Sequence, residues 1–208
     1  MKKHILLIIN ILAIAFNANA QTAETILKAA VDKLKSYENF GIEFDYNMIN
    51  AEAGIYETMD SNTVVLQGDA YRMVIMNQEI ICDGTTIWIY TPDNEEVMIS
   101  DASEDNSGNP FNMIESYYEN VTTKFVGESD GNIKKIEAIS ISSEDNFSSM
   151  ILTINVNTLE IKEIHIFDSN GNEFACIINK FVTNQKLPVD FFTFKESDYP
   201  DVEIIDMR

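Results

Sequence analysis

Few residues in this sequence have the types and spacing that catalysis requires. The two histidines are His4, close to the N-terminus, and His165, which stands between two isoleucines in an apolar run. A lone histidine in a strand is more often a hydrogen-bonded surface residue than a general base. The sequence has no GxSxG, HExxH, CxxC or phosphate-loop motif, and no carboxylate pair stands in an apolar run that would raise its pKa. The residues therefore predict a protein without enzymatic activity.

One acidic loop has a partial likeness to a calcium-binding loop. It is DASEDNSGNP, residues 101–110, in which Asp101, Ser103 and Asp105 have the alternating spacing of the first ligands. A calcium loop of this kind also needs glycine at its sixth position and glutamate at its twelfth. These positions hold Asn106 and Asn112. We therefore predict a solvated loop without a metal ion.

The first 20 residues have the features of a cleavable signal peptide. Two lysines precede an apolar run from Ile5 to Phe16, which is short for a bilayer-spanning helix. Ala18-Asn19-Ala20 then gives the small-x-small pattern of a signal peptidase site. We expect cleavage after Ala20 and an exported domain of residues 21–208, with a membrane anchor as the alternative.

The expected mature chain is strongly acidic. The formal net charge is −20, and the loss of Lys2 and Lys3 with the signal peptide makes it −22. Nucleic acid is excluded as a partner because its phosphates would repel such a chain. The charge disfavours anionic membrane surfaces and favours a basic protein partner, although solubility alone explains the acidity equally well.

Cys82 and Cys176 are the only cysteines, and each lies in an apolar run that reads as a strand. In such a position cysteine behaves as a small hydrophobic residue. An exported protein can form a disulfide, but the sequence does not show whether the two Cα atoms meet. We expect two buried free thiols, with a disulfide as the alternative.

Hydrophobic periodicity predicts one N-terminal helix followed almost entirely by strands. Residues 22–38 have apolar side chains at helical spacing, and residues 40–49 alternate as a half-buried strand. The later strands recur about every dozen residues, which is typical of antiparallel architectures. A second, short helix is expected to begin at Asn109-Pro110. The other strands are predicted at 63–67, 71–77, 81–99 (a hairpin), 122–126, 133–141, 150–156, 161–167, 174–181 and 191–194.

The hairpin ICDGTTIWIYTPDNEEVMI, residues 81–99, has apolar side chains on both faces. A sheet with one wet face should alternate apolar with polar residues, so both faces of this hairpin need a cover. Eight methionines remain after signal-peptide removal, and methionine adapts to ligands of variable shape. This apolar surplus favours a cavity for a lipid or other hydrophobic ligand. An ordinary, well-filled β core is the alternative.

Three segments carry a resemblance to one known family. ICDGTTIWIYTP is similar to a strand–turn–strand signature, with Asp83-Gly84 as the turn and Trp88 and Tyr90 after it. LPVDFFTFKESDYPDVEIIDMR, residues 187–208, is similar to a closing strand with a basic end, and ILKAAVDKLKSYENF is similar to the opening helix. In the order of these elements the whole mature chain resembles a divergent branch of LolA, the periplasmic carriers of outer-membrane lipoproteins.

The resemblance implies an α+β fold of mainly antiparallel strands. The expected form is an unclosed, strongly curved β half-barrel, with the N-terminal helix and the short central helix as a lid over a hydrophobic cavity. No cofactor and no catalysis are implied. The implied role is a monomeric periplasmic chaperone that takes the acyl chains of lipoproteins from an inner-membrane lipoprotein-releasing ABC transporter to the outer membrane and its acceptor. The alternative is a regulatory module of the cell envelope that senses a lipid or a protein with the same half-barrel.

Alternation within the expected elements selects the candidate cavity residues, because no family motif marks them. They are Phe44, Tyr46, Met48, Met73, Ile75, Trp88, Tyr90, Phe111, Ile114, Met150 and Leu152. The chain departs from the family in one place. Better-studied members have a basic residue before the signature hairpin that helps to hold the lid closed, whereas this chain has Gly68 and Asp69 there and Arg72 a few residues later. How its lid is held is therefore left open.

Overall fold

The computed structural model describes residues 22–103, 120–142 and 147–208. In these ranges the chain forms one α-helix, twelve strands and two short 3₁₀ turns. The expected signal peptide and the expected central helix with Phe111 and Ile114 lie outside them, as does most of the acidic loop. Within the described ranges no helix is long and apolar enough to cross a membrane.

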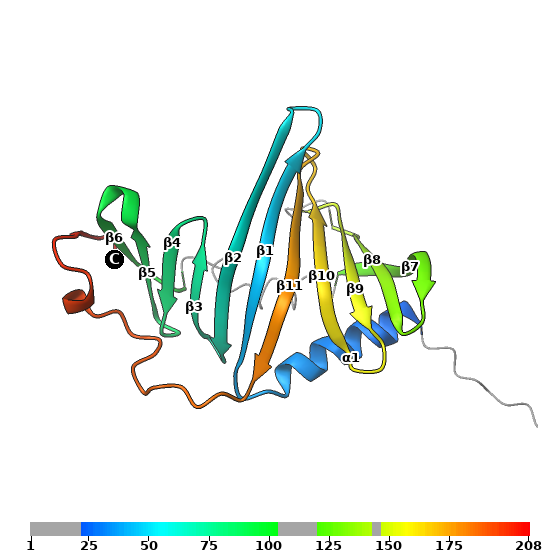
Figure 1. The fold of residues 1–208 in the computed structure, drawn as a ribbon, viewed down its shortest axis with the longest axis horizontal. Helices are drawn as coiled ribbons and strands as arrows, with labels where there is room; N and C mark the ends of the chain where they lie inside the picture. The colour runs from blue at the N-terminus through cyan, green and yellow to red at the C-terminus, as the bar shows by residue number, and fades with distance from the viewer. Residues whose placement is uncertain (1–21, 104–119, 143–146) are drawn as a thin grey trace, which may run out of the picture.

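The strands form one curved sheet that does not close on itself (Figure 1). Its order is β12-β6-β5-β4-β3-β2-β1-β11-β10-β9-β8-β7, and all neighbours are antiparallel except β12 and β6. The predicted fold class, a mainly antiparallel and unclosed sheet with an N-terminal helix, is confirmed. The bounds are β1 Phe40–Asn50, β2 Ile55–Gln67, β3 Ala70–Ile75, β4 Gln78–Cys82, β5 Thr86–Thr91, β6 Glu96–Asp101, β7 Val121–Asp130, β8 Ile133–Ser140, β9 Ser149–Asn155, β10 Glu160–Phe167, β11 Glu173–Thr183 and β12 Glu203–Asp206.

The helix α1 (Ala23–Lys35) defines the inner face of the sheet, the face against which it packs. Thr22 caps its start, with the side-chain oxygen accepting a hydrogen bond from the Thr25 backbone at 3.1 Å. Its end comes three residues earlier than predicted, because Ser36 turns its hydroxyl back onto the Lys33 carbonyl at 2.7 Å. Figure 1 shows α1 lying across the β8–β11 half of the sheet.

Two hydrophobic clusters cover the inner face. The first lies under α1, whose buried residues are Ala23, Ile26, Leu27, Ala30 and Val31. Its sheet side consists mainly of Ile136, Ala138, Met150, Leu152, Ile154 and Ile161. The second cluster lies over β1–β5 and has as its buried members Phe44, Val64, Leu66, Tyr71, Cys82 and Ile87. Cross-strand partners point to the same face, and the pairs from β10 through β11 and β1 to β5 connect the two clusters.

The outer face of β3–β6 is covered by the C-terminal arm, residues 184–202, which connects β11 to β12. The Phe194 ring stacks on Trp88 at 6.1 Å between ring centroids and on Tyr199 at 5.0 Å, and Tyr199 meets Tyr90 edge-on at 4.8 Å. The expected hairpin at 81–99 is thus apolar on both faces because Ile87 and Ile89 pack inward, while Trp88 and Tyr90 pack against the arm.

A polar network holds the same arm to the sheet. Arg72 forms an ion pair with Glu79 at 2.6 Å and donates a hydrogen bond to the Phe191 carbonyl at 3.2 Å. The Tyr199 hydroxyl donates to the other Glu79 oxygen at 2.6 Å. Burial, followed by this hydrogen bond and the Glu79 charge, raises the pKa of Tyr199 above its usual value. Arg72 therefore fixes the arm on the outer face.

The prediction of a strand at 191–194 is wrong. These residues form a turn, in which the Phe191 and Thr193 backbone amides donate to the carbonyls of Pro188 and Asp190. The aromatic run FFTF reads as a strand because its side chains are large and apolar, but they pack on the sheet as part of the arm instead of joining its ladder. The last strand is β12, which runs parallel to β6.

Candidate ligand-binding pocket

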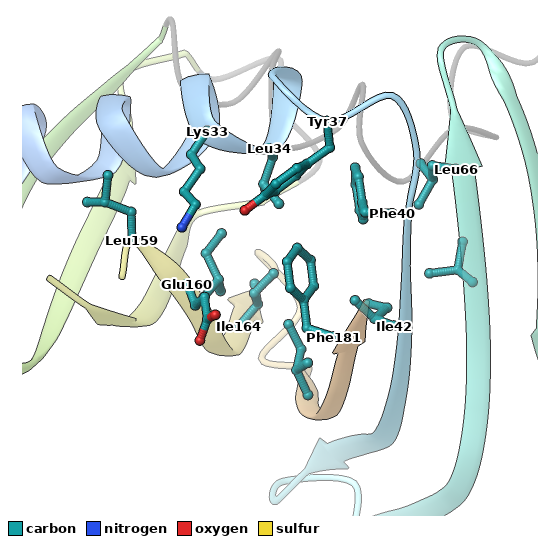
Figure 2. A pocket seen from close by; sticks show the side chains of 13 residues that line it. Lys33, Leu34, Tyr37, Phe40, Ile42, Leu66, Leu159, Glu160, Ile164 and Phe181 are labelled. Carbon is teal, nitrogen blue, oxygen red and sulfur yellow. The ribbon is translucent and has the colours of Figure 1, made fainter. Parts of the chain in front are cut away.

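An apolar pocket opens on the inner face where the last turn of α1 meets the middle of the sheet (Figure 2). The cavity has a volume of about 70 Å³ and opens to solvent at its mouth. This volume is smaller than the roughly 300–1,000 Å³ that is typical of pockets for small ligands. Its lining comes from α1, the loop after it, β1, β2, the β9–β10 turn, β10 and β11, and consists of Lys33, Leu34, Tyr37, Phe40, Ile42, Val64, Leu66, Leu159, Glu160, Ile161, Ile164, Ile178 and Phe181.

The local sequence explains how α1, β1 and β2 form one side of the pocket. Leu34 continues the apolar stripe of α1, and Tyr37 follows just beyond the helix end. The chain then enters β1, where alternation turns Phe40 and Ile42 to the same face. The register between β1 and β2 places Leu66 opposite Phe40 and Val64 opposite Ile42. One helix end and one strand start therefore supply most of one side of the pocket.

Three aromatic rings form the centre of the wall. The Phe181 ring lies 5.9 Å from the Tyr37 ring, edge-on, and 5.9 Å from the Phe40 ring. Figure 2 shows Tyr37 reaching from the loop after α1 toward Phe181, which stands on β11. Edge-to-face and tilted pairs at this spacing are favourable. The three rings thus connect the helix end to the strands.

Charged groups are confined to the rim of the pocket. The Lys33 ammonium donates a hydrogen bond to the Thr158 carbonyl, in the turn between β9 and β10. Glu160, at the start of β10, accepts from Lys162 at 2.8 Å. This hydrogen bond, followed by the charges of Lys162 and Lys33, lowers the pKa of Glu160, so that the carboxyl is ionised at neutral pH. The site has an apolar interior and a polar rim, which suits an amphiphile.

The structure places the predicted cavity residues on both faces of the sheet. Phe44, Tyr46, Met73 and Ile75 lie on the inner face, in the cluster beside the pocket. Met48 follows Tyr46 by alternation along β1, opposite Phe174. Met150 and Leu152 are also on the inner face, but they are buried beneath α1 and belong to the hydrophobic core.

Trp88 and Tyr90 do not join this group. They lie on the outer face against the C-terminal arm, so the expectation that they line the same cavity as Phe44 is wrong. The reason is the register of β4 and β5, which pairs Cys82 with Ile87 and turns Ile87 inward. Phe111 and Ile114 lie outside the described residues. None of the nine predicted residues in the described ranges is part of the pocket lining itself.

Sequence reasoning missed the residues that do line the pocket. Two patterns in the sequence could nevertheless have identified several of these lining residues. The apolar stripe of the N-terminal helix extends to Leu34 and Tyr37, and the alternation that selects Phe44 also selects Ile42 and Phe40. Leu159 and Phe181 carry no such signal, because their position depends on the pairing of β9, β10 and β11 with β1.

The other candidate groups have structural roles. Arg72, the basic residue that precedes the expected hairpin, is engaged with the arm on the outer face. His165 is half-buried, with its Nδ1 2.7 Å from Glu173, as expected for a hydrogen-bonded histidine. Cys82 and Cys176 are both free, as predicted, but only Cys82 is fully buried, whereas Cys176 is half-buried. The described residues contain no cluster of three or more groups that could hold a metal ion.

Comparisons with known proteins identify relatives of this chain. The family described as outer membrane lipoprotein carrier protein LolA matches residues 76–195. An outer-membrane lipoprotein carrier protein from Psychromonas ingrahamii is 28% identical over 115 residues, about half of each chain (54% of this one and 56% of the relative). A protein of the same name from Francisella tularensis is 24% identical and covers 97% of both chains. An uncharacterised conserved protein from Thermus thermophilus has a similar fold, with a TM-score of 0.54, 11% identity and coverage of 86% of this chain and 96% of that one.

Proposed function

The chain belongs to the LolA family of outer-membrane lipoprotein carriers, and we propose that it carries lipoproteins from the inner to the outer membrane with their acyl chains in the inner-face pocket. The members of this family are carriers and not enzymes. The observation that carries the proposal is the pocket itself, an open, apolar pocket between α1 and the sheet. Its lining is apolar apart from the rim groups Lys33 and Glu160 and the hydroxyl of Tyr37.

The hydrophobic effect supplies the binding energy in this proposal. Each methylene that leaves water for an apolar site contributes about 0.8 kcal/mol, so ten methylenes contribute about 8 kcal/mol. Micromolar affinity corresponds to about −8 kcal/mol, but ordering the ligand and the site costs several kcal/mol. A useful affinity therefore requires a long chain or more than one chain, as a lipoprotein provides.

The remaining parts of the proposal come from the sequence and the family. The signal peptide delivers the chain to the periplasm, where it acts as a monomer. An inner-membrane lipoprotein-releasing ABC transporter supplies the cargo, and the outer membrane or an acceptor there receives it. No bond is made or broken, and no cofactor takes part. The acidity of the chain favours a basic docking surface on these partners.

Purification from the native periplasm tests the proposal. Mass spectrometry of the purified protein should find acylated lipoproteins bound to it. Ile42→Glu, which places a charge in the pocket wall, should reduce the bound lipoprotein at least tenfold. Ile42 is half-buried, so the domain should remain folded.

The matched control is Val74→Glu on β3. Val74 is 41% exposed, and its cross-strand neighbours Thr63 and Glu79 place it on the outer face. This variant should retain the lipoprotein. Wild-type protein without any acylated cargo, or equal retention by both variants, would refute the proposal.

A further inference from the structure

We propose that the chain has a binding site for a saccharide with acetamido groups, separate from the inner-face pocket, in a polar cavity where α1, β1 and the C-terminal arm meet. This junction cavity has a volume of about 520 Å³, within the roughly 300–1,000 Å³ that is typical of sites for small ligands. It shares no lining residue with the inner-face pocket. Its lining consists of Glu38, Asn39, Gln67, Asn184, Gln185, Lys186, Leu187, Pro188, Val189 and Phe192.

The frame of the junction cavity is held by hydrogen bonds within the protein. The loop after α1, the end of β2 and the start of the arm meet at one end of the sheet (Figure 1). The Glu38 amide donates to the Asn184 side-chain oxygen at 2.9 Å. The buried Asn39 side chain bonds to both backbone groups of Gln185. The site is therefore preformed, which spares a ligand the cost of ordering the protein.

Polar side chains around this frame have hydrogen-bonding capacity left for a ligand. In the described part of the chain, the carboxamides of Gln67 and Gln185 make no hydrogen bond. The Glu38 carboxylate and the Lys186 ammonium form no ion pair there. A carboxamide has an acceptor oxygen and two N–H donors, and a hydroxyl both donates and accepts. One carboxamide can therefore bind two neighbouring hydroxyls of a sugar ring.

One stretch of the lining is apolar and consists of residues 187–189 and Phe192. Val189 is fully exposed and is the most exposed large hydrophobic side chain in the described ranges. A ligand that covers it removes apolar surface from water. The C–H face of a sugar ring suits this stretch. An acetamido group suits the whole lining, because its methyl group contacts the apolar stretch while its amide bonds to the carboxamides.

The same lining disfavours other classes of ligand. Glu38 and Lys186 have opposite charges, so the cavity favours neither anions nor cations, and the net charge of −20 repels phosphates. Peptides dock by adding a strand to a free sheet edge, or in apolar or aromatic-lined grooves. The strands β1, β2 and β11 are each paired on both sides, and the cavity has a single aromatic ring in its lining. A neutral saccharide therefore fits better than a peptide.

An NMR titration of the ¹⁵N-labelled mature chain, residues 21–208, measures both the affinity and the place of binding. The ligands are N,N′-diacetylchitobiose, maltose and the peptide triserine. Diacetylchitobiose should shift the backbone amides of residues 38–39 and 184–189. It should bind about tenfold more tightly than maltose, which has hydroxyls but no acetamido group, because methyl contacts and a hydrogen bond are added. Triserine should not bind.

Two variants assign the binding to named groups. Gln67→Ala should weaken diacetylchitobiose roughly two- to tenfold through the lost hydrogen bonds. Val189→Ser should remove most of the preference over maltose, and the fold should be unaffected because Val189 is fully exposed. Asn157→Ala is the control, since Asn157 is exposed in the β9–β10 turn and is not part of the cavity lining. This control should bind both sugars as the wild type does.

The inference fails if neither sugar binds, or if the shifted amides lie away from the junction cavity. Triserine binding at the same amides as tightly as the sugar would show a peptide site instead. Equal affinity for the two sugars in the wild type would refute the role of the acetamido groups. The proposed function is tested separately, because a fluorescent fatty-acyl probe should bind equally to the wild type and to Gln67→Ala whether or not a sugar binds.

Discussion

Burial keeps the Cys176 thiol protonated far above neutral pH. Desolvation, with a smaller contribution from the Asp45 charge, raises its pKa to about 12. Desolvation is also the largest of the causes that raise the pKa of Cys82. The thiolate is the reactive form of cysteine. We therefore expect Cys176 in the folded protein to be alkylated slowly at pH 8, with a rate that rises about tenfold per pH unit up to pH 10.

Peptide mass spectrometry of a timed alkylation series measures this rate at each cysteine. Protein unfolded in urea without reductant provides the control, and both thiols should then react quickly because neither is bridged. A Cys176 rate that levels off near about pH 8.5, the pKa of an exposed thiol, would contradict the buried state. It would show that the reaction takes place in an opened form of the protein.

For single residues, the sequence predicts whether a side chain lies in an apolar strand better than it predicts which face of the sheet the side chain occupies. The apolar runs around Cys82 and Cys176 correctly predict free thiols within strands. The same kind of run misplaces Trp88, because both faces of β5 are apolar and alternation alone cannot tell which one is inner. Register decides this, and register depends on pairing with a strand whose own faces are equally ambiguous.

At the scale of elements, one asparagine connects two junctions of the chain. Asn39, only 2% exposed, lies between α1 and β1. Its side chain donates to the Gln185 carbonyl at 2.9 Å and accepts from the Gln185 amide at 2.8 Å, where β11 continues into the arm. The Asn184 amide donates to the Asn39 carbonyl at 2.8 Å. The pocket residues Tyr37 and Phe40 are thus anchored beside the first residues of the arm.

Asn39→Ala tests this connection. The substitution removes two part-buried hydrogen bonds to the Gln185 backbone, so it should destabilise the protein by about 1–3 kcal/mol. The measurement is the urea midpoint at constant m-value. Asn157→Ala, at an exposed position of the β9–β10 turn, should change stability by less than about 0.5 kcal/mol. Equal effects of the two substitutions would show that this side chain does not hold the arm.

The elements show what periodicity can and cannot predict. The helix and most strands follow from apolar spacing, but β2 begins at Ile55, well before the predicted 63–67. Its first half is mostly exposed and is held by backbone pairing with β1, from Asn50 opposite Ile55 to Tyr46 opposite Met59. Hydrophobic patterns do not report strands of this kind. The turn at 191–194 is the opposite case, since apolar side chains there pack without a ladder.

At the scale of the whole molecule, the sheet has two apolar faces with two different covers. On the inner face α1 covers one half and leaves the pocket at its end. On the outer face the C-terminal arm covers β3–β6 through Phe194, Tyr199 and the Arg72 network. Of the two apolar faces of the expected hairpin, only one therefore lies on the pocket side of the sheet. The other is covered by the chain's own C-terminal arm.

This division makes Trp88, the only tryptophan, a reporter of the arm. Its indole stacks on Phe194 on the face opposite the pocket, so filling the pocket with an acyl ligand leaves its surroundings unchanged. We expect saturating monopalmitoyl glycerol to leave the Trp88 emission maximum in place, while Phe194→Ala shifts it to longer wavelength because water reaches the ring. Phe194→Ala should also cost about 1 kcal/mol of stability through the lost aromatic contacts. Fluorescence titration of both proteins measures the two effects, with displacement of a fluorescent fatty-acyl probe as proof that the pocket is filled. A ligand-induced shift in the wild type would contradict the independence of the two faces, and its loss in Asn39→Ala would locate the connection at the junction between α1, β1 and the arm.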